Sequence, residues 1–536
     1  MKGRWRISVV LLMFLLFCGC SAKSGEQAAD NQLDSGYGMD EGEETEAYTE
    51  AAVDSVAAET GVKACESFKI ETEASLEVVS LSSDHRFEEY LDDTGKISLV
   101  DVNYQSISLR EGNEALRKSI DDWMENREQE LEKEVQELQA EAQEKLDQKG
   151  SGEFHLCNVW HEIEISRADS RVVSLVEREY TYGVDDWDTD YTCVNFDAES
   201  GEQISVNDIL VDKQEIYEIA AQYCLDDFSA TYKNSYFDEG FKEEVYEMVD
   251  EDGKWYLDAT GIVLIYEDDD LDYSNEGVLK AHIPYEELVG YIKPEYVWEN
   301  TIGVAALSPN QSASLTVNGK NKKITVSSQR DEYYNQNVQI SYGEYVEAAG
   351  QYSNIDEIYL IKSDAGTYLM LDVNLKSDDY RTCLYVLDGE TIVLKDTLDA
   401  SIDPSNIGSD YFRLEFSIDV LGTYRTSKEY YIDAENKTLV TDDTEFQVSS
   451  YSYLYKKLVT TRELTVEQDG QDIILPAGSK IRILATDNQS EIRILMLDSG
   501  EEGILYFERG KGESKFGIYL NGEDQYDCFE SIPYAG

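Results

Sequence analysis

The chain has 536 residues, with 111 Asp and Glu against 45 Lys and Arg, and its formal net charge is −66 at pH 7. One hydrophobic core rarely organises so long a chain, so we expect two to four domains. A polyanion of this kind repels nucleic acid and anionic lipid and attracts cations and basic proteins, which excludes a nucleic-acid-binding function. The simplest interpretation of the charge is that it keeps a surface protein soluble.

The first nineteen residues predict export. Three basic residues precede an apolar run from Ile7 to Phe17, which is too short to span a bilayer and is typical of a signal peptide. The run leads into Phe17-Cys18-Gly19-Cys20-Ser21, which resembles the lipobox of bacterial lipoproteins. That resemblance implies that Cys20 receives the lipid and becomes the mature N-terminus. The protein would then sit on the outer face of the cytoplasmic membrane of a Gram-positive-type bacterium. An ordinary secretory signal is the alternative.

The next segments predict a tether followed by strands and a long helix. Residues 20–65 are rich in Glu, Asp, Ala, Gly and Ser, and a segment of this composition forms a flexible acidic tether. Alternating runs from Phe68 to Leu109 indicate strands. Apolar residues then recur at three- and four-residue steps from Leu116 to Leu146, and Gly150 closes the predicted helix. Its single apolar stripe would pack on a sheet or, as the alternative, on a coiled-coil partner.

Strand-like runs follow the helix: VWHEIEIS, RVVSLVEREYTY and DYTCVNFD. The segment DAESGEQISV predicts a hairpin. Two helices are expected, around Lys213–Asp227 and Glu239–Met248. Two more strands and a short helix follow within WYLDATGIVLIYE and LKAHIPYEELVGYI, and the domain is expected to end near Tyr296.

Residues 66–298 resemble a known extracytoplasmic domain. The matching stretches, in order, are VNYQSISL, SLVEREYTYG, TCVNFDAESGEQISVNDIL, WYLDATGIVLIYE and LKAHIPYEELVGYI. The similar domain, of unknown function, is shared by lysozyme-sensing anti-sigma factors and some peptidoglycan deacetylases. The resemblance implies an α+β fold, with helices on an antiparallel sheet, and an envelope sensor or binding module. Many members carry a Gly-Gly-Ala-His-Gly-like turn where this chain has Val184 to Asp188, so a function that rests on that histidine is not carried over.

The remaining chain predicts two β-rich domains. In residues 305–452, the segments LTVNGKNKKITV, IYLIKSDAGTYLMLDV and CLYVLDGETIVL each predict a hairpin, and their spacing favours a sandwich or propeller-like blades. In residues 456–536, short strands with Gly turns indicate a small barrel, which resembles a bacterial SH3-type module. The predicted fold is therefore multidomain: an α+β sensor-like domain, an all-β domain and an SH3-like barrel.

The acidic loop after the Tyr-x-Tyr strand is the one candidate binding site. An EF-hand calcium loop needs Gly at its sixth position, and neither this loop nor Asp268–Asp272 has it, so a solvated turn is favoured for both. An exposed Trp beside acids is also suited to anchoring an interface or stacking on a sugar. The predicted binding loop comprises Tyr182, Asp185, Asp186, Trp187 and Asp188.

Catalytic patterns are missing from the sequence. The four histidines form no HExxH or other metal-ligand spacing, the chain has no GxSxG motif, and its later cysteines are scattered singly without a zinc spacing. We therefore expect no catalytic residue, no metal ligand and no cofactor. Most of the cysteines are expected to be small buried hydrophobic side chains.

These observations predict a non-catalytic, lipid-anchored surface protein that binds or senses an envelope or host factor. The expected partners, besides the membrane, are a basic protein such as lysozyme, as the resemblance suggests, or peptidoglycan. One alternative is an envelope hydrolase that acts on peptidoglycan or glycans through carboxylates brought together only in three dimensions. Another is a structural spacer.

Overall fold

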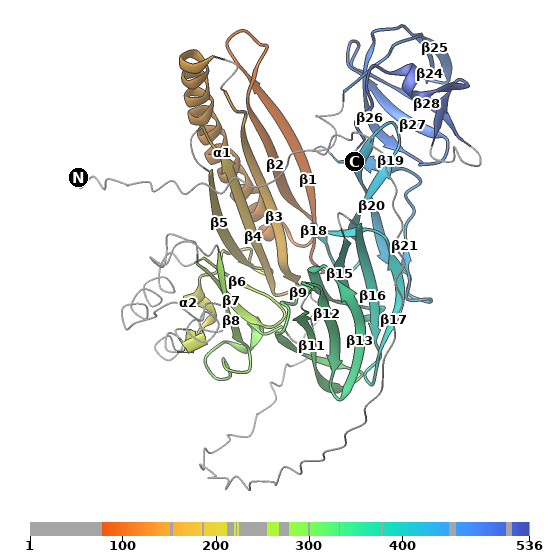
Figure 1. The fold of residues 1–536 in the computed structure, drawn as a ribbon. Helices are drawn as coiled ribbons and strands as arrows, with labels where there is room; N and C mark the ends of the chain where they lie inside the picture. Colours follow the sequence, from red (N-terminus) through yellow and green to blue (C-terminus); the bar gives the residue numbers. More distant parts are fainter. Residues whose placement is uncertain are drawn as a thin grey trace, which may run out of the picture. The chain divides into compact units, whose positions relative to one another are not determined.

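The computed structural model describes residues 78–536 except for 151–153, 185–186, 212–218, 221, 224–253, 267–277, 299–300, 332, 377–378, 450–456, 511–516 and 535–536. Residues 68–536 form one compact unit. It is mostly β, in several open sheets (Figure 1). The signal peptide, Cys20, the tether, the acidic loop Asp268–Asp272 and most of the two helices expected after Lys213 lie outside the described residues.

A ten-stranded sheet runs through residues 80–398. Its main path is β1-β2-β3-β9-β14-β15-β16-β17, and β4 pairs with β3 and β5. Its strands are β1 (Ser80–Leu91), β2 (Ser98–Glu111), β3 (Cys157–Asp169), β4 (Val172–Tyr182), β5 (Trp187–Asp197), β9 (Gly303–Ala306), β14 (Asn354–Ser363), β15 (Gly366–Lys376), β16 (Asp379–Leu387) and β17 (Ile392–Leu398).

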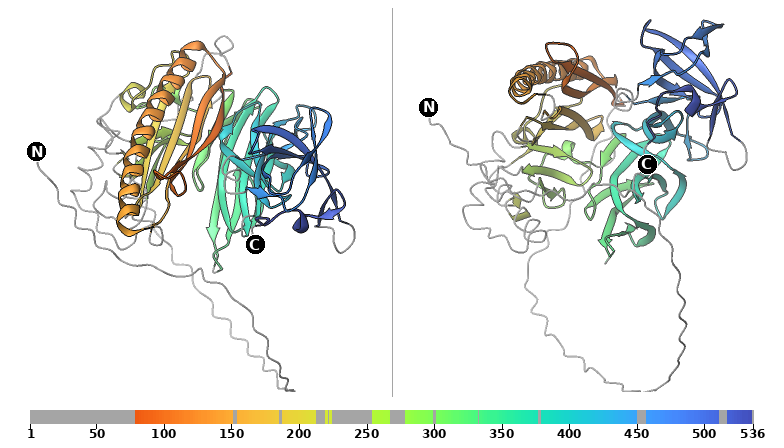
Figure 2. Two further views of the ribbon diagram at one scale, coloured as in Figure 1. Left: turned by 90° about the horizontal axis from the view of Figure 1, so that it is seen from above. Right: turned by 45° about the horizontal axis from the view of Figure 1, so that its top comes forward.

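Helix α1 (Glu114–Lys149) covers one face of β1–β5, as Figure 2 shows. Asn113 caps its start by accepting a hydrogen bond from the Leu116 N–H at 2.9 Å, and Gly150 ends it with a positive φ of 76°. The buried stripe of the helix packs on the sheet, as one of the two sequence interpretations expects. Because this long connection crosses over the sheet, β2 and β3 are parallel, whereas the resemblance implies an antiparallel sheet.

Strand β3 has two partners on one edge, and this forks the sheet. Residues Cys157 to His161 pair with β2, and Arg167 to Asp169 pair with β9. Between them β2 turns away from β3, since its later residues pair only with β1. The backbone N–H of Ile163, inside the fork, donates to the Gln105 side chain at 2.5 Å. A side chain thus replaces the missing strand partner.

Two smaller sheets pack beside the large one. Their strands are β6 (Lys254–Leu257), β7 (Gly261–Tyr266) and β8 (Leu279–Pro284) in one, and β10 (Ser312–Val317), β11 (Lys320–Arg330), β12 (Gln336–Tyr342) and β13 (Tyr345–Tyr352) in the other. One apolar core joins both sheets to β14–β16. The three predicted hairpins of residues 305–452 are confirmed as β10–β11, β14–β15 and β16–β17. Short helices α2 (Val206–Ile209) and η1 (Pro294–Tyr296) lie in the connections.

The C-terminal strands belong to an open thirteen-stranded sheet. They are β18 (Ser401–Ile407), β19 (Phe412–Asp419), β20 (Thr423–Ile432), β21 (Leu439–Val440), β22 (Phe446–Val448), β23 (Leu458–Val459), β24 (Leu464–Gln468), β25 (Gln471–Leu475), β26 (Lys480–Thr486), β27 (Glu491–Met496), β28 (Glu501–Arg509), β29 (Ile518–Leu520) and β30 (Glu523–Asp524), and α6 (Gln525–Cys528) follows. No sheet among the described strands closes on itself. The small barrel expected for residues 456–536 is therefore not seen as a closed barrel, because β22 pairs with β26 and continues the sheet.

The large sheet also crosses a predicted domain boundary. Strand β3 pairs with β9, and β9 pairs with β14, so strands from the ranges 66–298 and 305–452 lie in one sheet. The five domain ranges predicted from the sequence stay predictions. Among the described residues, every helix is too short or too polar to span a bilayer.

Candidate functional site: the β4–β5 hairpin

The predicted binding loop joins β4 to β5, and it displays aromatic side chains to solvent. Tyr182 and Trp187 are directly opposite each other across the hairpin. Trp187 is 64% exposed, Tyr180 is 40% exposed and Tyr182 is 41% exposed. The rings of Tyr180 and Trp187 have centroids 6.2 Å apart, which is a stacking distance. These three residues are called the hairpin patch below.

Two exposed acidic groups lie on the other face of the hairpin, because Asp188 and Asp190 are opposite Thr181 and Glu179. Asp188 is exposed and accepts a hydrogen bond from the Thr189 N–H at 2.9 Å, so its carboxylate stabilises the start of β5. Asp190 is also exposed and pairs with Lys254 at 2.7 Å. Asp185 and Asp186 lie outside the described residues. Of the five predicted loop residues, the structure thus brings Tyr182 and Trp187 together on one face and places Asp188 on the other.

The hairpin patch continues along one face of the sheet. In antiparallel strands, residues directly opposite each other point to the same face. Trp160 of β3 is opposite Tyr180, and Arg178 is opposite both Glu162 and Tyr191. The half-buried Trp160 therefore extends the aromatic surface inward from the tip of the hairpin.

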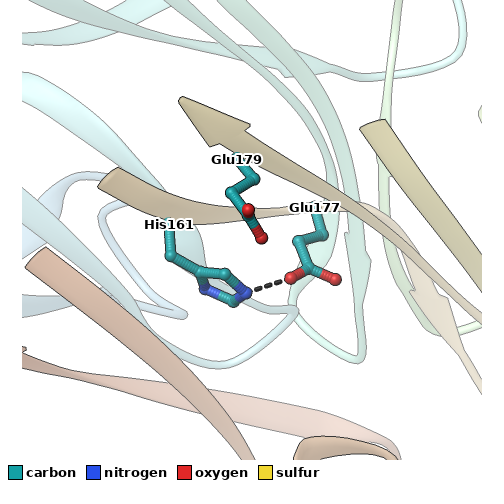
Figure 3. A group of neighbouring side chains, drawn as sticks. All are labelled: His161, Glu177 and Glu179. Carbon is teal, nitrogen blue, oxygen red and sulfur yellow. Dashed lines mark ion pairs between the residues drawn. The ribbon is translucent and has the colours of Figure 1, made fainter. Parts of the chain in front are cut away.

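The other face of the same hairpin is buried beneath α1 and carries a charged cluster. Figure 3 shows His161 of β3 directed at Glu177 of β4, with Glu179 beside them. The Nε atom of Arg127, on α1, donates to both Glu177 oxygens at 2.8 and 2.7 Å, and an Nη atom of Arg127 lies 3.3 Å from Glu179. Thr181 donates to Glu134 of α1 at 2.9 Å. These contacts fix the hairpin on the helix.

The two glutamates of the cluster differ in protonation. Burial favours the neutral form of Glu177, but hydrogen bonds from His161 and Arg127 outweigh it and lower the pKa of Glu177. Burial and a hydrogen bond shared with Glu134 raise the pKa of Glu179 to about 9, although Arg127 acts in the opposite direction. Glu177 is thus charged at neutral pH and Glu179 is protonated.

This cluster fits an ion pair better than a metal centre. One ligand atom from each of His161, Glu177 and Glu179 lies within 4.8 Å of the others, as three metal ligands would. However, the Arg127 guanidinium occupies both oxygens of Glu177, and Glu179 keeps its proton. A divalent ion would have to displace one cation and one proton.

The structure also places the other residues that the sequence analysis considered. His155 is exposed and apart from the cluster, while the buried cysteines Cys157, Cys383 and Cys528 pack as hydrophobic side chains. Sequence reasoning treated His161 as a lone strand histidine and missed its partners. The alternation Glu177-Arg178-Glu179 was the available signal, since it places two acids on one face of β4.

Comparisons with known proteins find solved structures that are similar to part of this chain. No family model and no curated protein matches the chain. A DUF3298 family structure from Bacteroides fragilis NCTC 9343 is 16% identical, with a TM-score of 0.32 over 41% of this chain and 96% of that one. A DUF3298 family protein from Pseudomonas aeruginosa PAO1 is 15% identical, with a TM-score of 0.29 over 40% of this chain and 96% of that one. The apo AtxE2 isopeptidase is 10% identical, with a TM-score of 0.20 over 60% of this chain and 57% of that one. About two-fifths of the chain thus has structural neighbours in the DUF3298 family, and these likenesses assign it no function.

Proposed function

We propose that this protein is a lipid-anchored, extracytoplasmic binding protein that captures a basic protein partner through the hairpin patch. The main observation behind this proposal is that Trp187, Tyr180 and Tyr182 lie together at the tip of one rigidly held hairpin. Each of the three side chains is at least 40% exposed. Burying a large aromatic side chain is favourable in free energy. Trp and Tyr therefore dominate the energetics of protein interfaces.

The negative charge of the chain favours a basic protein as the partner. The chain carries a formal net charge of −66, and Asp188 and Asp190 lie exposed on the other face of the same hairpin. A basic protein would therefore be attracted over a long range before the aromatic side chains make contact. The resemblance noted from the sequence suggests a lysozyme-like protein. The buried ion pairs under α1 support the proposal, because they hold the hairpin in one geometry and so reduce the ordering cost of binding.

A binding experiment tests this function. Residues 21–536 are titrated with lysozyme at low and physiological salt, using the natural chain, Trp187→Ala and the control Tyr334→Ala. Tyr334 is 77% exposed and lies far along the chain, between β11 and β12. We expect binding that weakens with salt, a loss of about tenfold or more for Trp187→Ala, and no change for the control. No binding at low salt, or equal loss in both variants, would contradict the proposal.

The finer predictions from the sequence belong to this proposal. They are the sensor-like α+β character of residues 66–298, the SH3-like character of residues 456–536 as a wall-facing module, and the absence of catalysis. The envelope hydrolase and the structural spacer remain the rival functions. A glycan-cleaving activity that survives Trp187→Ala would favour the hydrolase.

A further inference from the structure

A polar cleft opens where the large sheet forks. One cavity of about 360 Å³ lies at the fork between β2 and β3, and a second of about 660 Å³ adjoins it. The two cavities share His85, Asp403, Glu415 and Ser449 in their lining. Strand β18 supplies Asp403 and packs against both β1 and β3. Volumes of this size are typical of small-molecule sites.

One buried side chain in the cleft lacks a partner. Asn103 of β2 is only 7% exposed, and its Oδ1 atom accepts no hydrogen bond from any described residue. The neighbouring Gln105, by contrast, accepts from the Ile163 N–H and contacts His85 at 3.2 Å. A buried acceptor without a donor is costly. Asn103 therefore presents an acceptor to whatever fills the smaller cavity.

Two arginines that line the smaller cavity are each paired with a carboxylate. The Arg425 Nε donates to Glu415 at 2.7 Å, and Arg178 pairs with Glu162. A guanidinium that already has a carboxylate partner has little attraction left for a phosphate or another anion. Lys280, Glu164 and Asp403 add both signs of charge to the lining of the smaller cavity, so the lining favours a neutral ligand with many hydrogen-bonding groups over a simple anion or cation.

Glu357, another acid that lines the smaller cavity, is disfavoured in its charged form. Burial, and then the nearby charge of Glu164, raise the pKa of Glu357 well above its usual range, which favours its protonated form. A protonated carboxyl both donates and accepts, as a sugar hydroxyl does.

An aromatic side chain completes the site. Trp160 is half-buried and lines the smaller cavity together with Asn103 and Glu357. A flat apolar ring beside donors and acceptors matches a pyranose ring, which has apolar faces and a polar rim. We infer that this cleft binds a neutral saccharide, with Trp160 against a ring face and Asn103 accepting from a hydroxyl or amide N–H. This site lies further along the same face of the sheet than the hairpin patch, and its lining includes Trp160 but not Trp187.

Calorimetry with three probes tests the inference: cellotriose, maltotriose and chitotriose, each titrated into residues 21–536 at millimolar concentration. We expect at least one to bind. Trp160→Ala should weaken it about tenfold, and Asn103→Leu, which keeps the branched shape of the side chain but removes the acceptor, severalfold. Trp187→Ala is the matched control: it should leave the saccharide affinity unchanged even if it abolishes binding of a basic protein.

The outcomes separate this inference from the proposed function. Circular dichroism and thermal unfolding first establish that each variant is folded. If none of the three saccharides binds, or if both cleft variants bind as tightly as the natural chain, the saccharide site is refuted whatever lysozyme does. If Trp187→Ala weakens saccharide binding as much as Trp160→Ala does, the ligand sits on the hairpin patch instead, and the cleft assignment fails.

Discussion

Arg127 connects helix α1 to strand β4 from inside the protein. Its side chain is 18% exposed and that of Glu177 only 1%, so the pair is shielded from water. Removing one partner of such a pair leaves an uncompensated buried charge. The free-energy cost of that charge is far larger than the net stabilisation that the intact pair provides. The contact specifies how the hairpin sits on the helix.

We predict that Arg127→Met lowers the free energy of unfolding by about 3–5 kcal/mol. The matched control is Arg86→Met, because Arg86 pairs with Glu128 at 2.7 Å but is 52% exposed. A pair in solvent contributes about 0–1 kcal/mol, so the control should differ little from the natural chain. Chemical denaturation measures both. Equal losses in the two variants would show that the Arg127 pair is not shielded as described.

Glu179 should make stability depend on pH. Its pKa is raised to about 9 in the folded protein, while the unfolded chain releases the proton near the ordinary value of 4.5. Between these values the folded state holds the extra proton, so its stability falls as pH rises. Glu179→Gln cannot ionise. We expect it to match the natural chain near pH 4.5 and to exceed it by up to about 5 kcal/mol at pH 8.

Unfolding in urea at several pH values tests this, with Glu137→Gln, an exposed position on helix α1, as the control. The difference between Glu179→Gln and the natural chain should grow with pH, whereas the control should show no such trend. A difference that is constant from pH 5 to pH 8 would mean that Glu179 is charged in the folded protein.

At the scale of elements, the four-residue strand β9 joins the two parts of the large sheet. Gly303 begins it at a φ of 158°, where a Cβ atom would lie 2.4 Å from the Ala168 carbonyl oxygen of β3. Only a residue without Cβ allows β9 to approach β3 this closely. The position of β14 relative to β3 depends on this contact, and so does the fork that forms the cleft.

We predict that Gly303→Ala costs about 2–4 kcal/mol of unfolding free energy, as close overpacking does. Gly478→Ala is the control. Gly478 also has a positive φ, 87°, but nothing lies within 4 Å of its missing Cβ, so only the backbone cost of about 1 kcal/mol applies. If thermal unfolding shows the two variants to be equally stable, the tight approach of β9 to β3 is wrong.

At the scale of the whole molecule, the proposed anchor decides where all the binding surfaces act. We predict that cells supplied with a labelled fatty acid label this protein, and that Cys20→Ser abolishes the label and releases the protein from the membrane fraction. Cys18→Ser is the matched control and should leave both unchanged. Label that persists in Cys20→Ser would place the lipid elsewhere, and a cytosolic natural chain would remove the basis of the proposed function.

Local signals in the sequence determined the elements. The apolar stripe from Leu116 to Leu146 with Gly150 behind it predicted α1, and the Asn318-Gly319 turn predicted the β10–β11 hairpin. These signals depend on residues close together in the chain, so periodicity and turn chemistry are enough to read them. The exposed Trp187 was likewise predictable from its place beside a turn.

Tertiary structure alone decided how distant segments meet. The sequence could not show that β9 would bridge β3 and β14, that β22 would pair with β26 and leave the C-terminal sheet open, or that Arg127 would reach Glu177. Each of these contacts joins residues far apart in the chain, and no local pattern encodes which strand edge or buried charge a segment will find. The composition thus determined a mostly β, strongly acidic protein, while packing created the cleft and the buried ion pairs.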